Sequence, residues 1–317
     1  MDALRKRIIV TGGTGFLGRY VMQELNNRGY SNATAVAHQE YDLTQQADVR
    51  KLYRDTAPHI VIHLAARVGG IGANIAAPGQ FLYENLMMGA MLMEEGRLHN
   101  IDKFVSVGTV CSYPAETPTP FQEKDLWNGF PEPSNAPYGV AKRALLLQGQ
   151  AYVEQYGLQS VFAIPTNLYG PGDNFDLATS HVIPALIRKC LAAIEQKEST
   201  ITLWGSGEAS RDFLYVGDCA RALIDLMEMH THSMPINLGS GEEITIAQLA
   251  ALIAQTTGFT GQILWDASKP NGQKRRLVDT RAAQLAIGFK PTVSLANGLQ
   301  QTVAWYKEQM APAKIPA

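Results

Sequence analysis

The chain has 317 residues and a formal net charge of −2, and 46% of its residues are hydrophobic against 18% charged. That balance suits a globular protein with a substantial core, and the lack of a lysine or arginine block argues against nucleic acid or an anionic membrane as the main partner. The three cysteines, an odd number in so long a chain, do not form the disulfide framework of a small secreted domain. The first residues lead directly into a strand, and neither a signal-peptide core nor a membrane-spanning apolar run is found. We therefore expect a protein of the reducing cytoplasm.

Strands and helices alternate through the first half of the chain. We expect strands at 7–11, 33–37, 59–66 and 103–107, with helices at 16–28, 44–56, 78–99 and 137–156. Short apolar strands separated by helical spacing predict parallel βαβ units, in which helices cover both faces of the sheet. This order indicates a Rossmann-type α/β fold, a doubly wound parallel sheet, over residues 1–170.

The pattern changes after about residue 170. Short strands are expected at 201–204, 211–216, 236–238 and 262–265, set among helices. We interpret residues 171–317 mainly as a smaller mixed α/β lobe that binds the substrate, with some segments returning to the first domain. A cleft between two such lobes is a usual place for a small-molecule site.

The segment "VTGGTGFLG", residues 10–18, places a glycine turn between a strand and a helix. Backbone N–H groups and the helix dipole can meet a pyrophosphate there, so a dinucleotide site is predicted. Its residues are Gly12, Gly13, Thr14, Gly15, Phe16, Leu17 and Gly18. The second strand should end in an acid that holds the ribose, yet Ala37, His38 and Gln39 stand there. The absence of an acid favours NADP over NAD, although no arginine is present to bind the 2′-phosphate. Asp42, a few residues later, could instead face the adenine ring.

A second motif, "YGVAK", places Tyr138 and Lys142 four residues apart on one helix face. The lysine can then lower the pKa of the phenol, so that the phenol exchanges a proton near neutrality. An isolated YxxxK is more often an exposed helix pair. Here it follows a nucleotide turn and a fourth strand that ends near Thr109, whose hydroxyl would bond the same carbonyl oxygen. The three residues together indicate a hydride-transfer site.

With these motifs the chain resembles the extended short-chain dehydrogenase/reductases that act on nucleotide sugars. Within them it is similar to the NADPH-dependent group that epimerises GDP-4-keto-6-deoxy-D-mannose at C3 and C5 and reduces C4 to give GDP-L-fucose. The blocks "HLAARVGGIGAN", "GTVCSYP", "SHVIPALIRK" and "LWGSGEASRDFLYVGD" carry the resemblance nearly end to end. It implies NADP as cofactor, a GDP-sugar substrate, and a homodimer formed through a bundle that includes the helix at 137–156.

The resemblance also implies roles for particular residues. Cys111 and His181 would be the base and acid of the epimerisations, because a thiolate can remove a proton beside a ketone and an imidazolium can return one. Further cofactor contacts would come from His38, Asp42, Ala65, Ala66, Val107, Gly108, Pro165, Thr166, Asn167, Leu168 and His181, besides Tyr138 and Lys142. The substrate would be held by Asn167, Lys189, Trp204, Arg211 and Asn271.

Three positions depart from the family pattern. Thr109 replaces a serine, Lys189 stands where arginine is frequent, and Asn271 stands where aspartate is usual. A related GDP-4-keto sugar such as a heptose, or only part of the reaction, is therefore an alternative. A catalytically silent NADP-sensing scaffold is the alternative outside the enzyme class. No metal site is expected, because His230 and His232 lack further ligands.

Overall fold

The computed structural model describes residues 3–177, 179–269 and 272–310. Six parallel strands form the central sheet in the order β10-β5-β4-β3-β1-β2. They are β1 (Ile8–Thr11), β2 (Ala33–Val36), β3 (Ile60–His63), β4 (Lys103–Val107), β5 (Gln159–Pro165) and β10 (Ile236–Leu238). The predicted Rossmann-type fold is confirmed. Its strand order reverses between β1 and β3, which is where such sheets bind their ligands.

Side chains of the inner strands β1 and β3 alternate between two apolar cores. Ile8 and Val10 of β1 face one core, whereas Ile9 faces the other. Strand β3 repeats this, with Ile60 and Ile62 on the first side and Val61 on the second. Both faces of these strands are buried, which explains why they are continuously apolar in the sequence.

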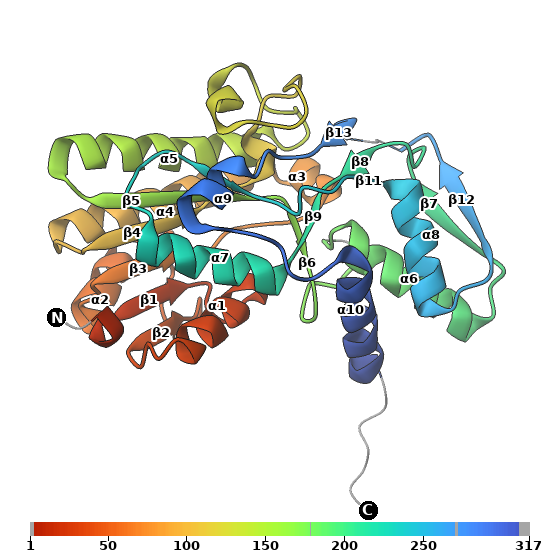
Figure 1. Ribbon diagram of the computed structural model, residues 1–317, viewed down its shortest axis with the longest axis horizontal. Helices are drawn as coiled ribbons and strands as arrows, with labels where there is room; N and C mark the ends of the chain where they lie inside the picture. Colours follow the sequence, from red (N-terminus) through yellow and green to blue (C-terminus); the bar gives the residue numbers. More distant parts are fainter. Residues whose placement is uncertain (1–2, 178, 270–271, 311–317) are drawn as a thin grey trace, which may run out of the picture.

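Helices cover both faces of the sheet (Figure 1). The first core contains side chains of α1 (Phe16–Asn27), α7 (Val216–Met229) and α9 (Arg281–Ile287). The second core is closed by α2 (Gln46–Thr56) and α4 (Pro78–Leu98), and α4 packs along α5 (Ala136–Tyr156). The expected helix at 78–99 is preceded by a separate short helix, α3 (Ile71–Ala76).

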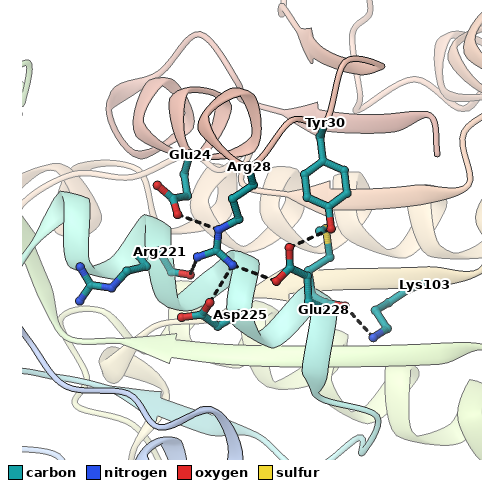
Figure 2. Close-up of polar contacts among 8 residues, drawn as sticks. Glu24, Arg28, Tyr30, Lys103, Arg221, Asp225 and Glu228 are labelled. Carbon is teal, nitrogen blue, oxygen red and sulfur yellow. Dashed lines mark hydrogen bonds and ion pairs between the residues drawn. The ribbon is translucent and has the colours of Figure 1, made fainter. Parts of the chain in front are cut away.

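The second half of the chain returns to the sheet through α7, and Figure 2 shows the polar contacts that attach it. Arg28, directly after α1, donates to Glu24 at 2.7 Å, to Asp225 at 2.7 Å and to Glu228 at 2.9 Å. Tyr30 also donates to Glu228, at 2.8 Å. These contacts join α7 to the end of α1, so this later segment packs with the central sheet.

The smaller lobe lies at the other end of the molecule, where α6 (Val182–Gln196), α8 (Ile246–Thr257) and α10 (Leu295–Met310) share a third core (Figure 1). Strand β7 (Thr200–Trp204) pairs with β12 (Gln262–Asp266), and β6 (Asn167–Tyr169) pairs with β9 (Phe213–Tyr215). Strand β8 (Ser210–Arg211) pairs with β11 (Ile244–Thr245) and β13 (Arg275–Arg276). Three 3₁₀ helices complete the elements: η1 (Ala3–Arg5), η2 (Val110–Ser112) and η3 (Glu123–Trp127).

The expected strand at 211–216 divides into β8 and β9 at Asp212. The amide of Asp212 donates to the Arg276 carbonyl at 2.9 Å, and its carboxylate accepts from the Ser240 amide and hydroxyl at 2.9 and 2.6 Å. The chain therefore changes partners at this buried carboxylate. Among the helices that the structure describes, none has the length and apolar character needed to cross a membrane.

Candidate active site

The glycine turn after β1 has the geometry of a pyrophosphate cradle. Gly12 has φ +69°, and a Cβ on Gly18 would collide with the backbone oxygen of Gly12. Gly15 is the N-cap of α1 and contributes no side-chain cap, so the first amides of the helix are left to an outside acceptor. The residues predicted here, from Gly12 to Gly18, form this turn and the first turn of α1, and they fit a dinucleotide.

The end of β2 offers little to a 2′-phosphate. Ala37, His38 and Gln39 follow the strand directly, and the Asp42 carboxylate is used locally, accepting from the Thr44 amide at 3.0 Å and hydroxyl at 2.7 Å. These Thr44 contacts hold the pKa of Asp42 below its ordinary value. Asp42 thus closes a turn of its own, and His38 is the basic side chain of this stretch.

Tyr138 and Lys142 stand on the first turns of α5 and face the carboxyl edge of the sheet. Lys142 is 2% exposed, its ammonium lies 6.0 Å from the centre of the Tyr138 ring, and burial lowers its pKa to about 8. Burial raises the pKa of Tyr138 well above its ordinary value, Cys111 raises it further, and a hydrogen bond with Thr109 partly offsets both. The expected lowering of the phenol pKa is therefore wrong for the protein's own groups, because burial and Cys111 together outweigh the Thr109 hydrogen bond. The phenol of Tyr138 thus keeps its proton at neutral pH.

His63, at the end of β3, is a buried neighbour of this pair. Its Nδ1 lies 2.8 Å from the Thr11 hydroxyl, and burial followed by the charge of Lys142 lowers its pKa well below the ordinary value. A neutral imidazole at this point adds no positive charge beside Lys142. The sequence "HIVIHLAA" does not predict this contact, because it depends on Lys142 of α5 being packed near the end of β3.

The turn that carries Thr109 and Cys111 is fixed to α5. Thr109 caps η2 by accepting from the Cys111 amide at 3.1 Å. Ser112 donates to the Gly139 carbonyl at 3.1 Å, and Arg143 donates to the Ser112 carbonyl at 2.6 Å. Because Tyr138 and Lys142 belong to the same helix, the turn with Thr109 and Cys111 is held in a fixed position relative to both of them.

Arg276 contacts the thiol of Cys111, and sequence reasoning missed it. Its Nη1 lies 3.3 Å from Sγ, and its side chain is 8% exposed. The neighbouring Arg275 points the other way and pairs with Glu243. Alternation along β13 is the signal that could have separated the two arginines, but a two-residue strand is too short to recognise from sequence.

His181 is the N-cap of α6 and lies near enough to the same guanidinium to feel its charge. Although water reaches much of its side chain, the protein around it lowers its pKa, and the charge of Arg276 lowers the pKa further. Cys111 and His181 are therefore both within electrostatic reach of Arg276. The structure thus places the two residues predicted as base and acid near the same arginine.

The predicted substrate residues come from the smaller lobe and the edge of the sheet. Arg211 is 9% exposed, and burial with the nearby Arg276 lowers its pKa to about 10. Trp204 is 56% exposed at the end of β7, with the Lys269 ammonium 5.7 Å from its ring centre. Lys189 donates to the Thr202 carbonyl at 2.8 Å and Asn167 to the Asp212 carbonyl at 3.0 Å. Asn271 lies outside the described residues.

The remaining predicted cofactor residues lie at or just after the carboxyl ends of β3, β4 and β5, with one in β6. They are Ala65, Ala66, Val107, Gly108, Pro165, Thr166 and Leu168. Beside them is a cavity of about 560 Å³ whose lining includes Ala66, Phe81 and Thr179, so it is bordered by both halves of the chain. Phe81 also packs edge-on against Tyr138, with ring centres 6.3 Å apart. The cavity thus opens next to Tyr138.

A parallel sheet with a glycine cradle and a Thr-Tyr-Lys set defines a nucleotide-dependent epimerase or reductase. The chain belongs to the NAD dependent epimerase/dehydratase family, whose model matches residues 8–239. It is 39% identical over 309 residues to a probable GDP-L-fucose synthase 1 of Oryza sativa subsp. japonica, covering 97% of this chain and 94% of that protein.

Two solved structures also resemble this chain over nearly its whole length. A GDP-6-OMe-4-keto-L-xylo-heptose reductase from C. jejuni superposes with a TM-score of 0.90 at 28% identity, covering 96% of this chain and 99% of that one. A GDP-L-fucose synthetase from Naegleria fowleri bound to NADP superposes with a TM-score of 0.87 at 30% identity, covering 98% and 96%.

Proposed function

We propose that the protein is an NADPH-dependent epimerase/reductase that converts GDP-4-keto-6-deoxy-D-mannose to GDP-L-fucose, by inverting C3 and C5 and reducing the C4 ketone. The observation that carries the proposal is Cys111 in the same turn as Thr109, beside Tyr138. Reduction alone needs no thiol there, whereas inversion next to a ketone needs a base. The similar proteins from Oryza sativa and Naegleria fowleri are named a probable GDP-L-fucose synthase and a GDP-L-fucose synthetase.

The ketone makes epimerisation possible. Removing a proton from C3 or C5 gives an enolate whose charge is delocalised onto the ketone oxygen, where Tyr138 donates a hydrogen bond. We assign Cys111, as thiolate, to proton removal and His181, as imidazolium, to proton return on the opposite face. The lowered pKa of His181 makes it a stronger acid once protonated.

Reduction uses the other residues of the same unit. Bound NADPH supplies the hydride that reduces C4. Tyr138 then gives its proton to the oxygen, and the Lys142 ammonium next to it stabilises the phenolate that forms. Thr109 orients the phenol through its hydrogen bond. We assign residues 1–170 to cofactor binding and 171–317 mainly to substrate binding. The GDP-sugar would be held by Lys189, Trp204, Arg211 and Asn271 of the second segment, together with Asn167 near the end of the first.

A GDP-4-keto heptose is the second candidate substrate, favoured by the C. jejuni reductase structure. Lysine at 189 and asparagine at 271 depart from the usual residues and both belong to the substrate side. The two candidate substrates are distinguished by giving the protein each GDP-4-keto sugar with NADPH. The rate of NADPH oxidation, followed by the absorbance of the cofactor, is then compared. Binding of NADPH with no turnover of either sugar would favour a scaffold.

We also propose a cytoplasmic homodimer formed through α4 and α5. Three free cysteines fit a reducing compartment. Exposed apolar side chains lie on both helices, and they are Leu82, Tyr83, Leu98, Leu147 and Tyr156. Leu147→Glu should convert the dimer to a monomer by light scattering, whereas Leu285→Glu on α9, 88% exposed, should not. A monomeric wild type would refute the dimer.

The reaction is tested most simply by product analysis. Incubation of the protein with GDP-4-keto-6-deoxy-D-mannose and NADPH should consume one NADPH per product and give GDP-L-fucose. Recovery of a reduced sugar with unchanged C3 and C5 would leave only the reductase assignment standing.

A further inference from the structure

Arg276 is a buried cation, and among the described residues the side chains that accept its hydrogen bonds are uncharged. Its Nε donates to the Gln273 side-chain oxygen at 2.9 Å, and its Nη1 to Cys111 Sγ at 3.3 Å. With the Asn135 amide turned so that both of its groups are satisfied, the Asn135 oxygen accepts from Nη2 at 3.0 Å. Among the described residues no carboxylate forms an ion pair with Arg276. A guanidinium that is 8% exposed and lacks a counter-ion is costly.

The side chain that can become its counter-ion is the one it touches. A neutral thiol is a weak acceptor, whereas a thiolate receives a charge-assisted hydrogen bond from the same N–H. Arg276 is held in place on its other two nitrogens, so this donor is already aimed at Sγ before any substrate arrives. The buried charge and the ionised base therefore stabilise each other.

We propose that Arg276 is the counter-ion that keeps Cys111 ionised as the epimerisation base, and that it sets the pH range of the epimerase half-reaction. This inference rests on the proposed function for the role of Cys111. It adds a residue of β13 to the catalytic unit, since the guanidinium touches the atom that takes the proton. Proton removal then converts the thiolate to a thiol, and Arg276 favours the return to thiolate when that proton leaves.

The same charge acts on the proposed acid. Arg276 disfavours the imidazolium of His181, so His181 should lose its proton at lower pH than it would without that charge. Other groups also face the thiol: Tyr138 from α5 resists ionisation beside it, and Arg211 from β8 adds positive charge. Removing the Arg276 charge should therefore move the limb of the pH profile that His181 sets upward. A residue that served only packing would not move it.

The strand that carries Arg276 provides matched variants. Arg276→Gln removes the charge, and Arg276→Lys keeps it with altered geometry. Arg275→Gln removes a charge from the adjacent, exposed residue that pairs with Glu243. Gln273→Ala leaves Arg276 intact and removes one acceptor that fixes it. If Arg276→Gln did not fold, as judged by circular dichroism and NADPH binding, Arg276→Lys and Gln273→Ala would still report on the contact.

The direct test is the pH dependence of alkylation of Cys111 by iodoacetamide, followed by intact mass and peptide mapping. Cys190 and Cys219 are both buried and should stay unmodified. We expect Arg276→Gln to raise the midpoint of the profile by one pH unit or more, which is about a tenfold loss of thiolate at a given pH below the midpoint. Arg276→Lys should recover most of that loss, Gln273→Ala should give a smaller upward shift, and Arg275→Gln should leave the midpoint unchanged.

Three outcomes would overturn the inference. An unchanged midpoint in Arg276→Gln would show that the guanidinium does not hold the thiolate, and a loss of GDP affinity in the same variant would assign it to the diphosphate. A midpoint shift of equal size in Arg275→Gln would show that alkylation responds to any nearby positive charge and not to the contact between Arg276 and Cys111. Because alkylation needs no substrate, a shifted midpoint in a protein that shows no C3 or C5 exchange would support the contact and refute the proposed epimerase activity.

Discussion

The carbonyl oxygen of Cys111 faces Gly139 across a gap too narrow for a methyl group. A Cβ on Gly139 would lie 2.5 Å from that oxygen. Gly139 directly follows Tyr138 on α5, so the proton donor and the turn that carries the thiol approach each other at a glycine. This contact explains how α5 holds Tyr138 and the turn that carries Cys111 in a fixed relative position.

Gly139→Ala should therefore damage the epimerase half-reaction. The turn must move to admit the methyl group, and overpacking of this kind costs about 1–3 kcal/mol of folding free energy. We expect deuterium exchange at C3 and C5 to fall at least tenfold, with the lower stability measured by urea unfolding. Gly79→Ala is the control, because nothing lies within 4 Å of its Cβ position and alanine should stabilise that helix by about 0.5–1 kcal/mol. Full exchange in Gly139→Ala would contradict the packing account.

Lys142 predicts a pH dependence of stability. Burial lowers its pKa from 10.5 to about 8 in the folded protein, so between these values the unfolded chain binds more protons and stability rises with pH. The penalty is fully present below about pH 8. From about pH 8 to pH 9.5 the wild type should gain about 2 kcal/mol relative to Lys142→Met, measured by denaturant unfolding.

The control for this measurement is Lys290→Met, because Lys290 is exposed. Its stability curve should run parallel to that of the wild type, whereas the Lys142→Met curve should diverge. Parallel curves for wild type and Lys142→Met would show that the buried ammonium does not carry the penalty. Lys142→Met should also abolish ketone reduction.

How much of this could be predicted differs between the parts of the chain. The strand predicted at 103–107 and the helix that carries "YGVAK" are confirmed, because burial in both follows a local period. The strand, β4, has the predicted bounds. The strand at 236–238 was expected at the right residues, yet it pairs with β5 in the central sheet, because strand partners are decided by distant segments. The division of 211–216 at Asp212 depends on Ser240 and Arg276, which no local pattern contains.

The site shows the same limit. Thr109, Cys111, Tyr138 and Lys142 could be named because motif spacing and resemblance identify them. Arg276 could not be named, because its contact with Cys111 joins residues 165 positions apart and depends on β13 pairing with β8. The rise in the Tyr138 pKa was equally hidden, since burial is a property of the packed protein.

Cofactor selectivity should respond to Ala37, which directly follows β2. Ala37→Arg would place a guanidinium where the ribose end of a dinucleotide bound at the glycine turn would lie, and a hydrogen bond to a charged phosphate is worth about 1.5–3 kcal/mol. We expect NADPH affinity to rise about tenfold relative to NADH, by fluorescence titration of both cofactors. Ala37→Gln, without the charge, should change the ratio little. An equal gain for both cofactors would place the ribose elsewhere.

Cys111→Ser and Tyr138→Phe should separate the two half-reactions. Cys111→Ser removes the base but leaves the cofactor cradle and the Thr109, Tyr138 and Lys142 set, so exchange should fall by a factor of a hundred or more, on the order of a lost catalytic base, while NADPH binding is kept. Tyr138→Phe removes the proton donor and should chiefly abolish NADPH oxidation. Loss of both activities to the same degree in each variant would show that the two functions are not separable.

The central claim is that one site performs both inversions and the reduction. It is tested most directly by incubating the protein with GDP-4-keto-6-deoxy-D-mannose and NADPH in deuterated water and locating deuterium in the product by NMR. The account predicts deuterium at both C3 and C5, and its loss in Cys111→Ser. Reduced product without deuterium at either carbon would contradict the roles assigned to Cys111 and His181.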